Sequence, residues 1–220
     1  MGSMKNGKKF KRSGRPLYRF IKRTVDIIGA LVGCVLLIPI TIIIWMANLF
    51  SSDNGSVFYF QKRIGLNGKS FVLFKYRSMV TDADRILNKY LSENPDAKKE
   101  FEEFKKLKND PRITPIGRFI RKSSLDEFPQ FINVLKGDMS LVGPRPYLCR
   151  ERSALGDAYN TIITVKPGLT GPWQVGGRND IPFCDRVKLD VEYVNNLSIL
   201  KDAKYLLGTF IELFRKRGAM

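Results

Sequence analysis

The stretch Ile27–Phe50, IIGALVGCVLLIPITIIIWMANLF, decides the fold of this chain because it holds no charged side chain. About 20 consecutive apolar residues are enough to cross the hydrocarbon core of a bilayer. A signal peptide has a shorter apolar run that is followed by a small-residue cleavage site, and this sequence fits that pattern poorly. The stretch is therefore predicted to lie in a membrane.

Pro39 lies near the middle of the apolar stretch, and its presence is compatible with two membrane topologies. Proline removes one backbone hydrogen bond and presses on the carbonyl of Val35, so it kinks or breaks a helix. A break at Ile38-Pro39 would leave two arms of about twelve residues, each too short to span a bilayer. A re-entrant hairpin within one leaflet and a single spanning helix both fit these residues.

The segments on both sides of the apolar stretch are basic. Nine lysine and arginine residues lie between Lys5 and Arg23, and Lys62, Arg63 and Lys69 follow the stretch. Cytoplasmic segments next to a membrane carry an excess of such residues, so a hairpin with both ends in the cytoplasm fits. A single helix that spans the whole bilayer also fits, because the segment before the apolar stretch is more basic than the segment after it.

The composition narrows the class of protein. The 220 residues suffice for one ordinary domain with attachments, and the formal net charge of +17 suits a polyanionic partner, either a membrane face or nucleic acid. No histidine is present, which excludes Ser-His and Cys-His nucleophile pairs and His-ligated zinc. Three scattered cysteines, Cys34, Cys149 and Cys184, indicate a reducing compartment and are expected to serve packing.

Three regions follow from these patterns. Residues 1–23 hold an expression scar, Met1–Met4, and the basic N-terminal segment. Residues 24–51 form the membrane segment. Residues 52–220 are expected to fold as one domain outside the bilayer, with a helical insertion over residues 81–110.

A β-hairpin is predicted directly after the membrane segment. Val57–Phe60 and Ser70–Phe74 are strand-like, and Asn67-Gly68 between them is a favoured tight-turn pair. The second strand ends at Lys75 and Arg77, separated by one tyrosine. These cations face either a substrate phosphate or the lipid headgroups.

Two further segments have helical periodicity. In the insertion, Thr81 is predicted to cap one helix and Asn94-Pro95 to open a second, in a solvated region without chemistry of its own. Near the C-terminus, Ile199–Arg217 mixes apolar residues with lysines and arginines. That pattern fits an amphipathic helix on the membrane surface or a core-facing helix with a basic outer side.

Chemistry-bearing residues are densest in Arg118–Pro146, RFIRKSSLDEFPQFINVLKGDMSLVGPRP. Ser124 and Glu127 have the spacing of a capping box, so the acidic pair Asp126-Glu127 can be read as a capped helix start. Neighbouring carboxylates repel, however, and keeping both ionised requires a nearby cation or metal. Basic residues from Arg118 to Lys122 lie just upstream, and a helix N-terminus attracts phosphate. A metal-assisted phosphate site is therefore predicted beside the capping interpretation.

Arg145 stands between Pro144 and Pro146, which restrict its backbone. A guanidinium held in this way can bind phosphate as a fork, although an ordinary proline-rich turn also fits. Two later loops, residues 166–171 and 175–179, carry glycines that can approach a ligand through bare backbone. Neither loop matches the common phosphate-binding glycine patterns.

Five stretches, in this order and spacing, resemble the monotopic polyprenyl-phosphate phosphoglycosyl transferases, the bacterial sugar transferases that start polysaccharide and glycan assembly. The match covers the chain from Tyr18 to the C-terminus. The stretches are KRTVDIIGA (22–30), FKYRSM (74–79), SSLDEFPQFINVLKGDMSLVGPRP (123–146), KPGLTGPWQVGGRN (166–179) and LDVEYVNNLS (189–198).

The resemblance implies an α+β chain with a re-entrant, proline-broken membrane helix, a small β-hairpin and a mainly helical catalytic domain with interfacial amphipathic helices. It places the helix break at Ile38-Pro39 and the domain on the cytoplasmic face of the bacterial inner membrane. The polyanionic partner is then anionic membrane lipid, and nucleic acid is not expected.

The resemblance also implies a reaction. Asp126 would attack the β-phosphate of a UDP-sugar, expel UMP and pass the sugar phosphate to undecaprenyl phosphate. The long insertion is similar to that of relatives that transfer hexose 1-phosphate, which favours UDP-galactose or UDP-glucose as the donor. Residue roles carried over from the family are Mg²⁺ or proton handling for Glu127 together with Asp126, phosphate binding for Arg145, Arg121 and Lys75, and substrate contacts for Arg178 and Asp190.

Two other functions fit parts of the pattern. A membrane-anchored basic binding module would need Asp126-Glu127 only as a helix cap. A transferase without a covalent intermediate would release no UMP until polyprenyl phosphate is added. Mass analysis of the protein with a UDP-sugar and no lipid acceptor separates these alternatives from the covalent reaction.

Overall fold

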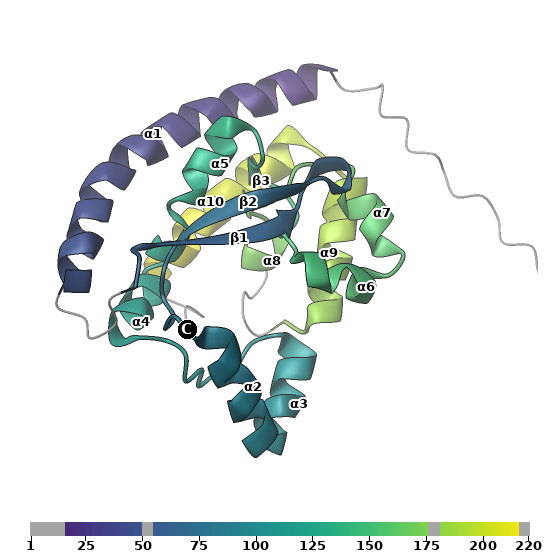
Figure 1. The fold of residues 1–220 in the computed structure, drawn as a ribbon. Helices are drawn as coiled ribbons and strands as arrows, with labels where there is room; N and C mark the ends of the chain where they lie inside the picture. The colour runs from purple at the N-terminus through teal and green to yellow at the C-terminus, as the bar shows by residue number, and fades with distance from the viewer. Residues whose placement is uncertain (1–15, 50–54, 176–180, 216–220) are drawn as a thin grey trace, which may run out of the picture.

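The computed structural model describes residues 16–49, 55–175 and 181–215, and Figure 1 shows their arrangement. The predictions for the basic residues before Pro16 and for Arg178 fall outside these ranges. The elements, in chain order, are α1 (Pro16–Leu49), β1 (Phe58–Ile64), β2 (Ser70–Tyr76), α2 (Ala83–Glu93), α3 (Pro95–Phe104), α4 (Pro115–Lys122), α5 (Gln130–Lys136), β3 (Ser140–Val142), α6 (Arg152–Leu155), α7 (Ala158–Ile162), β4 (Gly168–Thr170), α8 (Pro172–Val175), α9 (Phe183–Asn195) and α10 (Ile199–Arg215).

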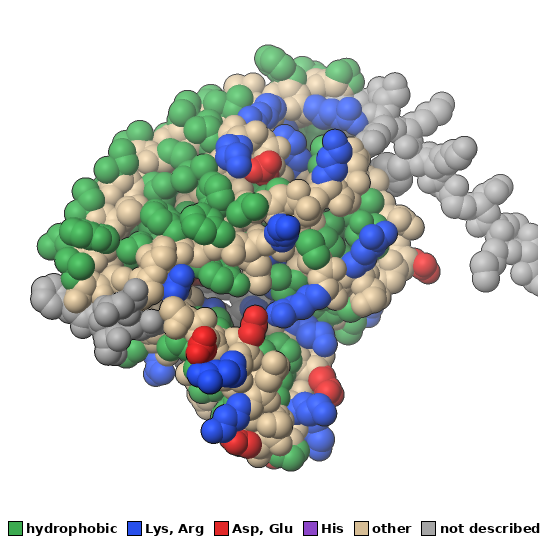
Figure 2. All heavy atoms as spheres, viewed as in Figure 1, with side chains coloured by type: hydrophobic (Ala, Val, Ile, Leu, Met, Phe, Trp, Pro, Cys, Tyr) green, Lys and Arg blue, Asp and Glu red, His purple; other side chains and the backbone are tan. Residues whose placement is uncertain are grey.

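The long helix α1 has two chemically different faces. Its buried residues recur every three or four positions from Asp26 through Ala30, Gly33 and Leu37, as one face of a helix requires. A Cβ atom on Gly33 would lie 2.3 Å from the ring of Phe131, so glycine there permits a close approach of α1 and α5. The opposite face exposes leucine, isoleucine, valine and phenylalanine, and Figure 2 shows apolar side chains gathered over this helix.

α1 runs without interruption through Ile38 and Pro39. Figure 1 shows it as one curved helix that arches over α5 and the hairpin. By length and composition it is long and apolar enough to cross a membrane. The two-armed re-entrant hairpin is therefore not confirmed, although proline near the middle of a helix is a known cause of bending.

Both halves of α1 pack on the same domain. In the N-terminal half, Asp26 Oδ1 accepts hydrogen bonds from the hydroxyl of Ser140 at 2.9 Å and from the backbone N–H of Leu141 at 2.8 Å. In the C-terminal half, Thr41 is hydrogen-bonded to the hydroxyl of Tyr76 on β2. The helix therefore lies along the domain over most of its length.

The predicted hairpin is confirmed. β1 and β2 pair antiparallel from Phe58 opposite Tyr76 to Ile64 opposite Ser70. The turn residues Asn67 and Gly68 have φ values of 58° and 76°, the left-handed conformation that this pair favours.

A second pair of strands was not foreseen from the sequence. β3 and β4 pair in parallel, with Ser140 opposite Gly168. A Cβ atom on Gly168 would lie 2.1 Å from the backbone nitrogen of Gly143, and one on Gly171 would lie 2.1 Å from the Gly143 carbonyl oxygen. Glycines of the loop at residues 166–171 thus let two backbones pack together, and the prediction that they approach a ligand is not supported.

Helix starts differ from the predictions in two places. Asp82 rather than Thr81 precedes α2, whereas Pro95 opens α3 as predicted. Ser124 has φ +57° and makes no capping hydrogen bond, so the predicted capping box is wrong. Because Pro129 lacks an N–H and suits a first helical turn, the following helix begins only at α5.

The core lies between α1, the hairpin and the helices behind it. One cluster joins Ala30 of α1, Leu73 of β2, Val134 of α5 and Val194 of α9. The pair α2 and α3 projects from the opposite side of the molecule to the arch of α1 (Figure 1). The insertion therefore points away from the face that α1 covers.

Candidate active site

The acidic pair Asp126-Glu127 lies on a single 3₁₀ turn, Leu125–Glu127, between α4 and α5. Lys75, near the end of β2, contacts both carboxylates: its Nζ is 3.3 Å from Oδ2 of Asp126 and 3.0 Å from Oε1 of Glu127. The side chain of Asp126 is 14% exposed and that of Glu127 is 33% exposed. The structure thus brings together three of the residues that the sequence nominated.

Asn133 fixes the strand that carries Lys75. This fully buried residue of α5 donates its Nδ2 to the carbonyl of Val72 at 2.7 Å and accepts the N–H of Phe74 at 3.0 Å. The amide therefore pairs with β2 as a neighbouring strand would. Lys75 follows at the end of this strand, and its ammonium group lies against the two carboxylates.

The two carboxyl groups differ in their electrostatic surroundings. Burial raises the pKa of Asp126 against the opposing effects of Lys75 and Arg121, and Glu127 adds to the rise. Burial would also raise the pKa of Glu127, but the ion pair and hydrogen bond with Lys75, helped by Arg145, bring it below its usual value. The surroundings therefore shift the two pKa values in opposite directions, upward for Asp126 and downward for Glu127.

Arg121 and Arg145 approach the pair from two sides. Arg121, on α4, donates its Nε to the hydroxyl of Ser78 at 2.9 Å and lies close enough to lower the pKa of Asp126. Arg145 follows β3, and its guanidinium lies 5.3 Å from the ring centre of Trp173. Both predicted phosphate ligands therefore lie around the acidic pair, as a site for a polyanion requires.

Asp190 lies behind Arg145. It is fully buried on α9, and its Oδ2 accepts the backbone N–H of Arg145 at 3.0 Å and the hydroxyl of Tyr147 at 2.8 Å. Burial raises the pKa of its carboxyl to about 7. This placement supports the backbone of Arg145, whereas the sequence had suggested a contact with substrate.

Arg63 is a cation of the site that the sequence analysis missed. Its Nη1 donates to the carbonyl of Pro146 at 2.9 Å, which ties β1 to the loop of Arg145. Burial and the nearby Arg145 lower its pKa to about 10. Strand alternation would have identified it, because Tyr59 lies opposite Lys75 and Arg63 is four residues further along the same face.

Lys106 is another basic residue near the pair that the sequence analysis missed, and Arg186 lies close to Lys106. Lys106, just after α3, lies 5.4 Å from the ring centre of Trp173. The charge of Lys106 helps to lower the pKa of Glu127, so the two groups are close. Arg186 is 1% exposed and donates to the carbonyl of Phe104 at 2.8 Å. No local sequence pattern marks either residue, because both reach the site only through the tertiary fold.

Two carboxylates side by side are a suitable partial site for Mg²⁺. This ion is often bound through one or two carboxylates, with substrate phosphates and water completing its shell. Asp126 and Glu127 are brought together by their shared contact with Lys75. Across the described residues, no group of three or more His, Cys, Asp or Glu side chains is positioned to hold a metal ion alone. The donors therefore fit an ion that arrives with a phosphate ligand.

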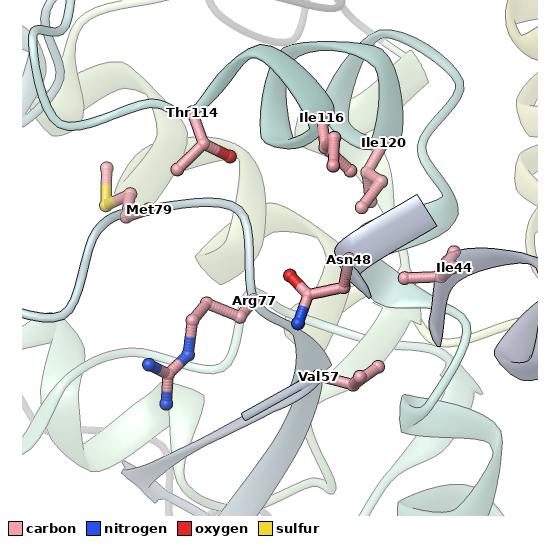
Figure 3. A pocket seen from close by; sticks show the side chains of 8 residues that line it. All are labelled: Ile44, Asn48, Val57, Arg77, Met79, Thr114, Ile116 and Ile120. Atoms are coloured by element: carbon pink, nitrogen blue, oxygen red, sulfur yellow. The ribbon is translucent and has the colours of Figure 1, made fainter. Parts of the chain in front are cut away.

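A hollow opens between the α2–α3 pair and the body of the molecule, with charged side chains of both signs at its rim (Figure 2). A separate small pocket lies where the C-terminal end of α1 meets α4. Ile44, Asn48, Arg77 and Ile120 are among its lining residues, and Figure 3 shows the guanidinium of Arg77 extending away from the isoleucines. The acidic pair does not line this pocket, so this pocket is not the candidate reaction site.

Comparison with known proteins points to one family. Residues 17–216 match the family described as bacterial sugar transferase. The undecaprenyl-phosphate galactose phosphotransferase of Salmonella typhimurium is 45% identical over 201 residues, which cover 91% of this chain and 42% of that protein. The exopolysaccharide production protein ExoY of Rhizobium meliloti is 42% identical over 205 residues, covering 93% of this chain and 90% of ExoY.

A third relative differs in its sugar. The UDP-glucose:undecaprenyl-phosphate glucose-1-phosphate transferase of Escherichia coli is 35% identical over 210 residues, covering 91% of this chain and 42% of that protein. The chain thus spans less than half of two relatives and nearly the full length of the third. What all three share with it is the region that holds the acidic pair.

Proposed function

This chain belongs to the bacterial sugar transferase family, and from that premise we propose that it transfers a hexose 1-phosphate from a UDP-sugar to undecaprenyl phosphate. UDP-galactose and UDP-glucose are the proposed donors, because similar proteins are named for galactose and for glucose transfer. The product would begin a polysaccharide, in keeping with the similarity to an exopolysaccharide production protein.

The observation that carries this proposal is the acidic pair within a ring of cations. Lys75 contacts both carboxylates, and Arg121 and Arg145 lie close enough to change their pKa values. A carboxylate surrounded by guanidinium and ammonium groups can meet a diphosphate without strong repulsion. A helix cap alone would need none of these cations.

We propose that the reaction has two steps. An Oδ atom of Asp126 forms a bond to the β-phosphorus of the UDP-sugar, while the bond from that phosphorus to the bridging oxygen breaks and UMP leaves. A phosphate oxygen of undecaprenyl phosphate then bonds to the same phosphorus and releases the Asp126 carboxylate. Arg145 and Arg121 bind the phosphate oxygens and stabilise the charge that develops on them.

Mg²⁺, bound by Asp126 and Glu127 together with the diphosphate, would neutralise charge on the phosphates and make UMP a better leaving group. The ion pair and hydrogen bond with Lys75 outweigh burial and lower the pKa of Glu127, which favours the anionic form that a metal ligand needs. Asp126 is then available to the phosphorus once its proton has left.

The membrane helix suits a lipid acceptor. Both halves of α1 pack on the domain that holds the acidic pair, while the opposite face of the helix is apolar and exposed. We propose that α1 enters one leaflet and returns on the cytoplasmic side, bending near Pro39. The domain would then rest on anionic lipids, with the phosphate of the acceptor within its reach.

Intact-mass analysis tests the covalent step. Purified protein with Mg²⁺ and UDP-galactose or UDP-glucose, but no lipid acceptor, is expected to gain the mass of a hexose phosphate and to release UMP. Asp126→Asn should do neither, and Asp82→Asn, an exposed carboxylate of the insertion, should behave like the wild type. Wild-type protein that turns over with acceptor yet never gains mass would favour direct transfer.

Cysteine labelling tests the topology. After replacement of the native cysteines by serine, single cysteines at Arg19 and Lys62 should react with a membrane-impermeant reagent from the same side of sealed vesicles. Reaction from opposite sides would reject the re-entrant helix without affecting the proposed chemistry. A release assay over a panel of UDP-sugars would identify the donor.

A further inference from the structure

The β-hairpin turns one of its faces to the outside of the molecule. Phe60 lies opposite Phe74, so both side chains point to one side of the two strands, and Val72 points to the same side. Phe60 is 57% exposed and Val72 is 41% exposed, whereas Leu73, which points to the other side, is 1% exposed. The hairpin therefore buries one face in the domain and leaves an apolar face exposed among the residues that the structure describes.

The aromatic rings on this exposed face contact one another. The ring centres of Phe60 and Phe74 are 5.3 Å apart, and the two rings meet edge to face. The ring centre of Phe58 is 6.4 Å from that of Phe60 and 5.4 Å from that of Tyr76. An aromatic row thus runs from the exposed middle of the hairpin to the end of β2.

The aromatic row ends on the membrane helix. The hydroxyl of Tyr76 is hydrogen-bonded to Thr41 of α1, and Tyr76 shares a core cluster with Leu37 of the same helix. This half of α1 also exposes Ile42 and Trp45, each at 52%. Figure 2 shows apolar side chains gathered over α1 and continuing toward the hairpin. The exposed hairpin face is therefore joined to a helix that is long and apolar enough to cross a membrane.

The formal charge of the hairpin has one sign only. Residues 55–80 include lysines and arginines but no aspartate or glutamate. Lys62 lies opposite Val72 on the apolar face, and both Lys62 and Lys69 are exposed. An apolar face bordered by lysines suits the boundary between the headgroups and the acyl chains of an anionic bilayer, because the rings can enter the boundary while the ammonium groups reach lipid phosphates.

We infer that the hairpin face formed by Phe60, Val72 and Phe74 is a second membrane-contact surface, which rests in the headgroup region of an anionic bilayer beside α1. The inference goes beyond the proposed reaction and rests only on the proposed entry of α1 into a membrane. A bilayer fits better than a protein partner, because the face adjoins α1 and its charge is of one sign. Lys75 leaves the same hairpin on its other side, so this contact would fix the height of the acidic pair above the lipid.

Site-directed fluorescence in vesicles tests the contact. After replacement of the native cysteines by serine, a single cysteine at Phe60 carries an environment-sensitive fluorophore, and the matched control carries it at Lys99 on the exposed surface of α3. The full chain is reconstituted into vesicles of equal parts phosphatidylethanolamine and phosphatidylglycerol, with a spin label on the lipid headgroup as the quencher. The fluorophore at residue 60 should lose about half of its emission or more, whereas the fluorophore at residue 99 should lose little.

A fluorophore at Val72→Cys separates the roles of ring and charge. Adding Phe60→Asp should reduce its quenching by lipid at least about twofold, because a carboxylate is costly to move out of water. Vesicles of phosphatidylcholine alone should also reduce the quenching, because Lys62 then lacks anionic lipid. Lys99→Asp is the control for added negative charge and should leave the quenching unchanged. Phe60→Asp should unfold at the same temperature as the wild type, since Phe60 is mostly exposed.

Two results would overturn the inference. Quenching of the fluorophore at residue 60 by aqueous iodide, as strong as at residue 99 and without quenching by lipid, would place the face in water. Protection from both quenchers would show that protein covers the face, and crosslinking through residue 60 would then identify a second copy of this chain. None of these measurements uses a UDP-sugar, so their outcome is independent of whether the proposed reaction takes place.

Discussion

Two clusters of partly buried charge differ in how their charges are arranged. The anchor cluster, at the N-terminal end of α1, consists of Tyr18, Lys22, Tyr193 and Asp202. Asp202 accepts hydrogen bonds from Tyr18 at 2.9 Å and Lys22 at 2.8 Å on Oδ2, and from Tyr193 at 2.7 Å on Oδ1. One cation meets one anion, and each carboxylate oxygen has a donor.

The site cluster, around the acidic pair, is arranged differently. Two carboxylates share one lysine, and three arginines lie close enough to interact electrostatically with the pair: Arg63, Arg121 and Arg145. Paired, partly buried charge can hold two elements together, whereas several cations around two carboxylates suit a polyanionic ligand. We therefore expect the anchor cluster to serve structure and, under the proposed function, the site cluster to serve binding.

The largest expected effect comes from removing Asp126, the proposed nucleophile of the site cluster. Asp126→Asn should lower the rate of UMP release by about four orders of magnitude, or about 5.4 kcal/mol in the activation free energy. Thermal unfolding should change little, because the amide keeps the shape of the side chain. Loss of folding together with activity would indicate that Asp126 belongs with the anchor cluster.

Breaking the anchor cluster should have the opposite signature. Asp202→Ala leaves Lys22 without its carboxylate partner and should lower the free energy of unfolding by about 3 kcal/mol. Folded protein at low temperature should retain the KM of the wild type. Asp185→Ala, whose partner Lys188 is 76% exposed, should leave the unfolding midpoint close to that of the wild type.

Removing Lys75, which contacts both carboxylates, tests the comparison through the pH dependence of the reaction rate. Lys75→Met should reduce kcat/KM roughly tenfold to a hundredfold. Lys75 lowers the pKa of both carboxyl groups, so without it they take up protons at higher pH. The acid limb of the pH–rate profile should therefore move to higher pH. Lys62→Met, on the opposite face of the hairpin, should leave the profile unchanged, and an unshifted limb in Lys75→Met would contradict the assigned role.

The smallest expected effect concerns Asp190, which supports the site cluster from behind. Its pKa is raised to about 7, so the folded state holds the proton more tightly than the unfolded state does. Wild-type stability should therefore fall, relative to Asp190→Asn, as the pH rises from about 4 to about 7, by at most about 1.4 kcal/mol per pH unit. Unfolding midpoints across that pH range measure the difference, and parallel curves would show that Asp190 does not titrate there.

Local patterns predicted the elements that depend on near neighbours. The hairpin formed as expected, because Asn67 and Gly68 accept positive φ and the flanking residues favour strands. Pro95 opened a helix where its missing N–H is harmless. The capping box predicted at Ser124 was wrong. A capping box needs a helix that continues, whereas only one 3₁₀ turn follows Ser124.

Part of the candidate site could be predicted from the sequence. Asp126, Glu127, Arg121 and Arg145 lie close together along the chain, and the resemblance of the motifs named their roles. Lys75 was nominated as well: its position at the end of a strand left phosphate and lipid headgroups open, and the resemblance implied phosphate. The structure shows that its ammonium group contacts Asp126 and Glu127.

The sequence by itself determined that this chain carries a helix long and apolar enough to cross a membrane, a hairpin and an acidic pair, because hydropathy, turn chemistry and motif spacing are local properties. Only the tertiary structure decided that Lys106 and Arg63 join Lys75 around the acidic pair and that Asp202 anchors α1. Each of these contacts joins residues far apart in the chain, and their energies depend on burial and distance, which appear only when the elements pack. The net charge of +17 says nothing of such positions, whereas the structure shows Lys22 paired with Asp202 at the anchor and Lys75 in contact with the acidic pair.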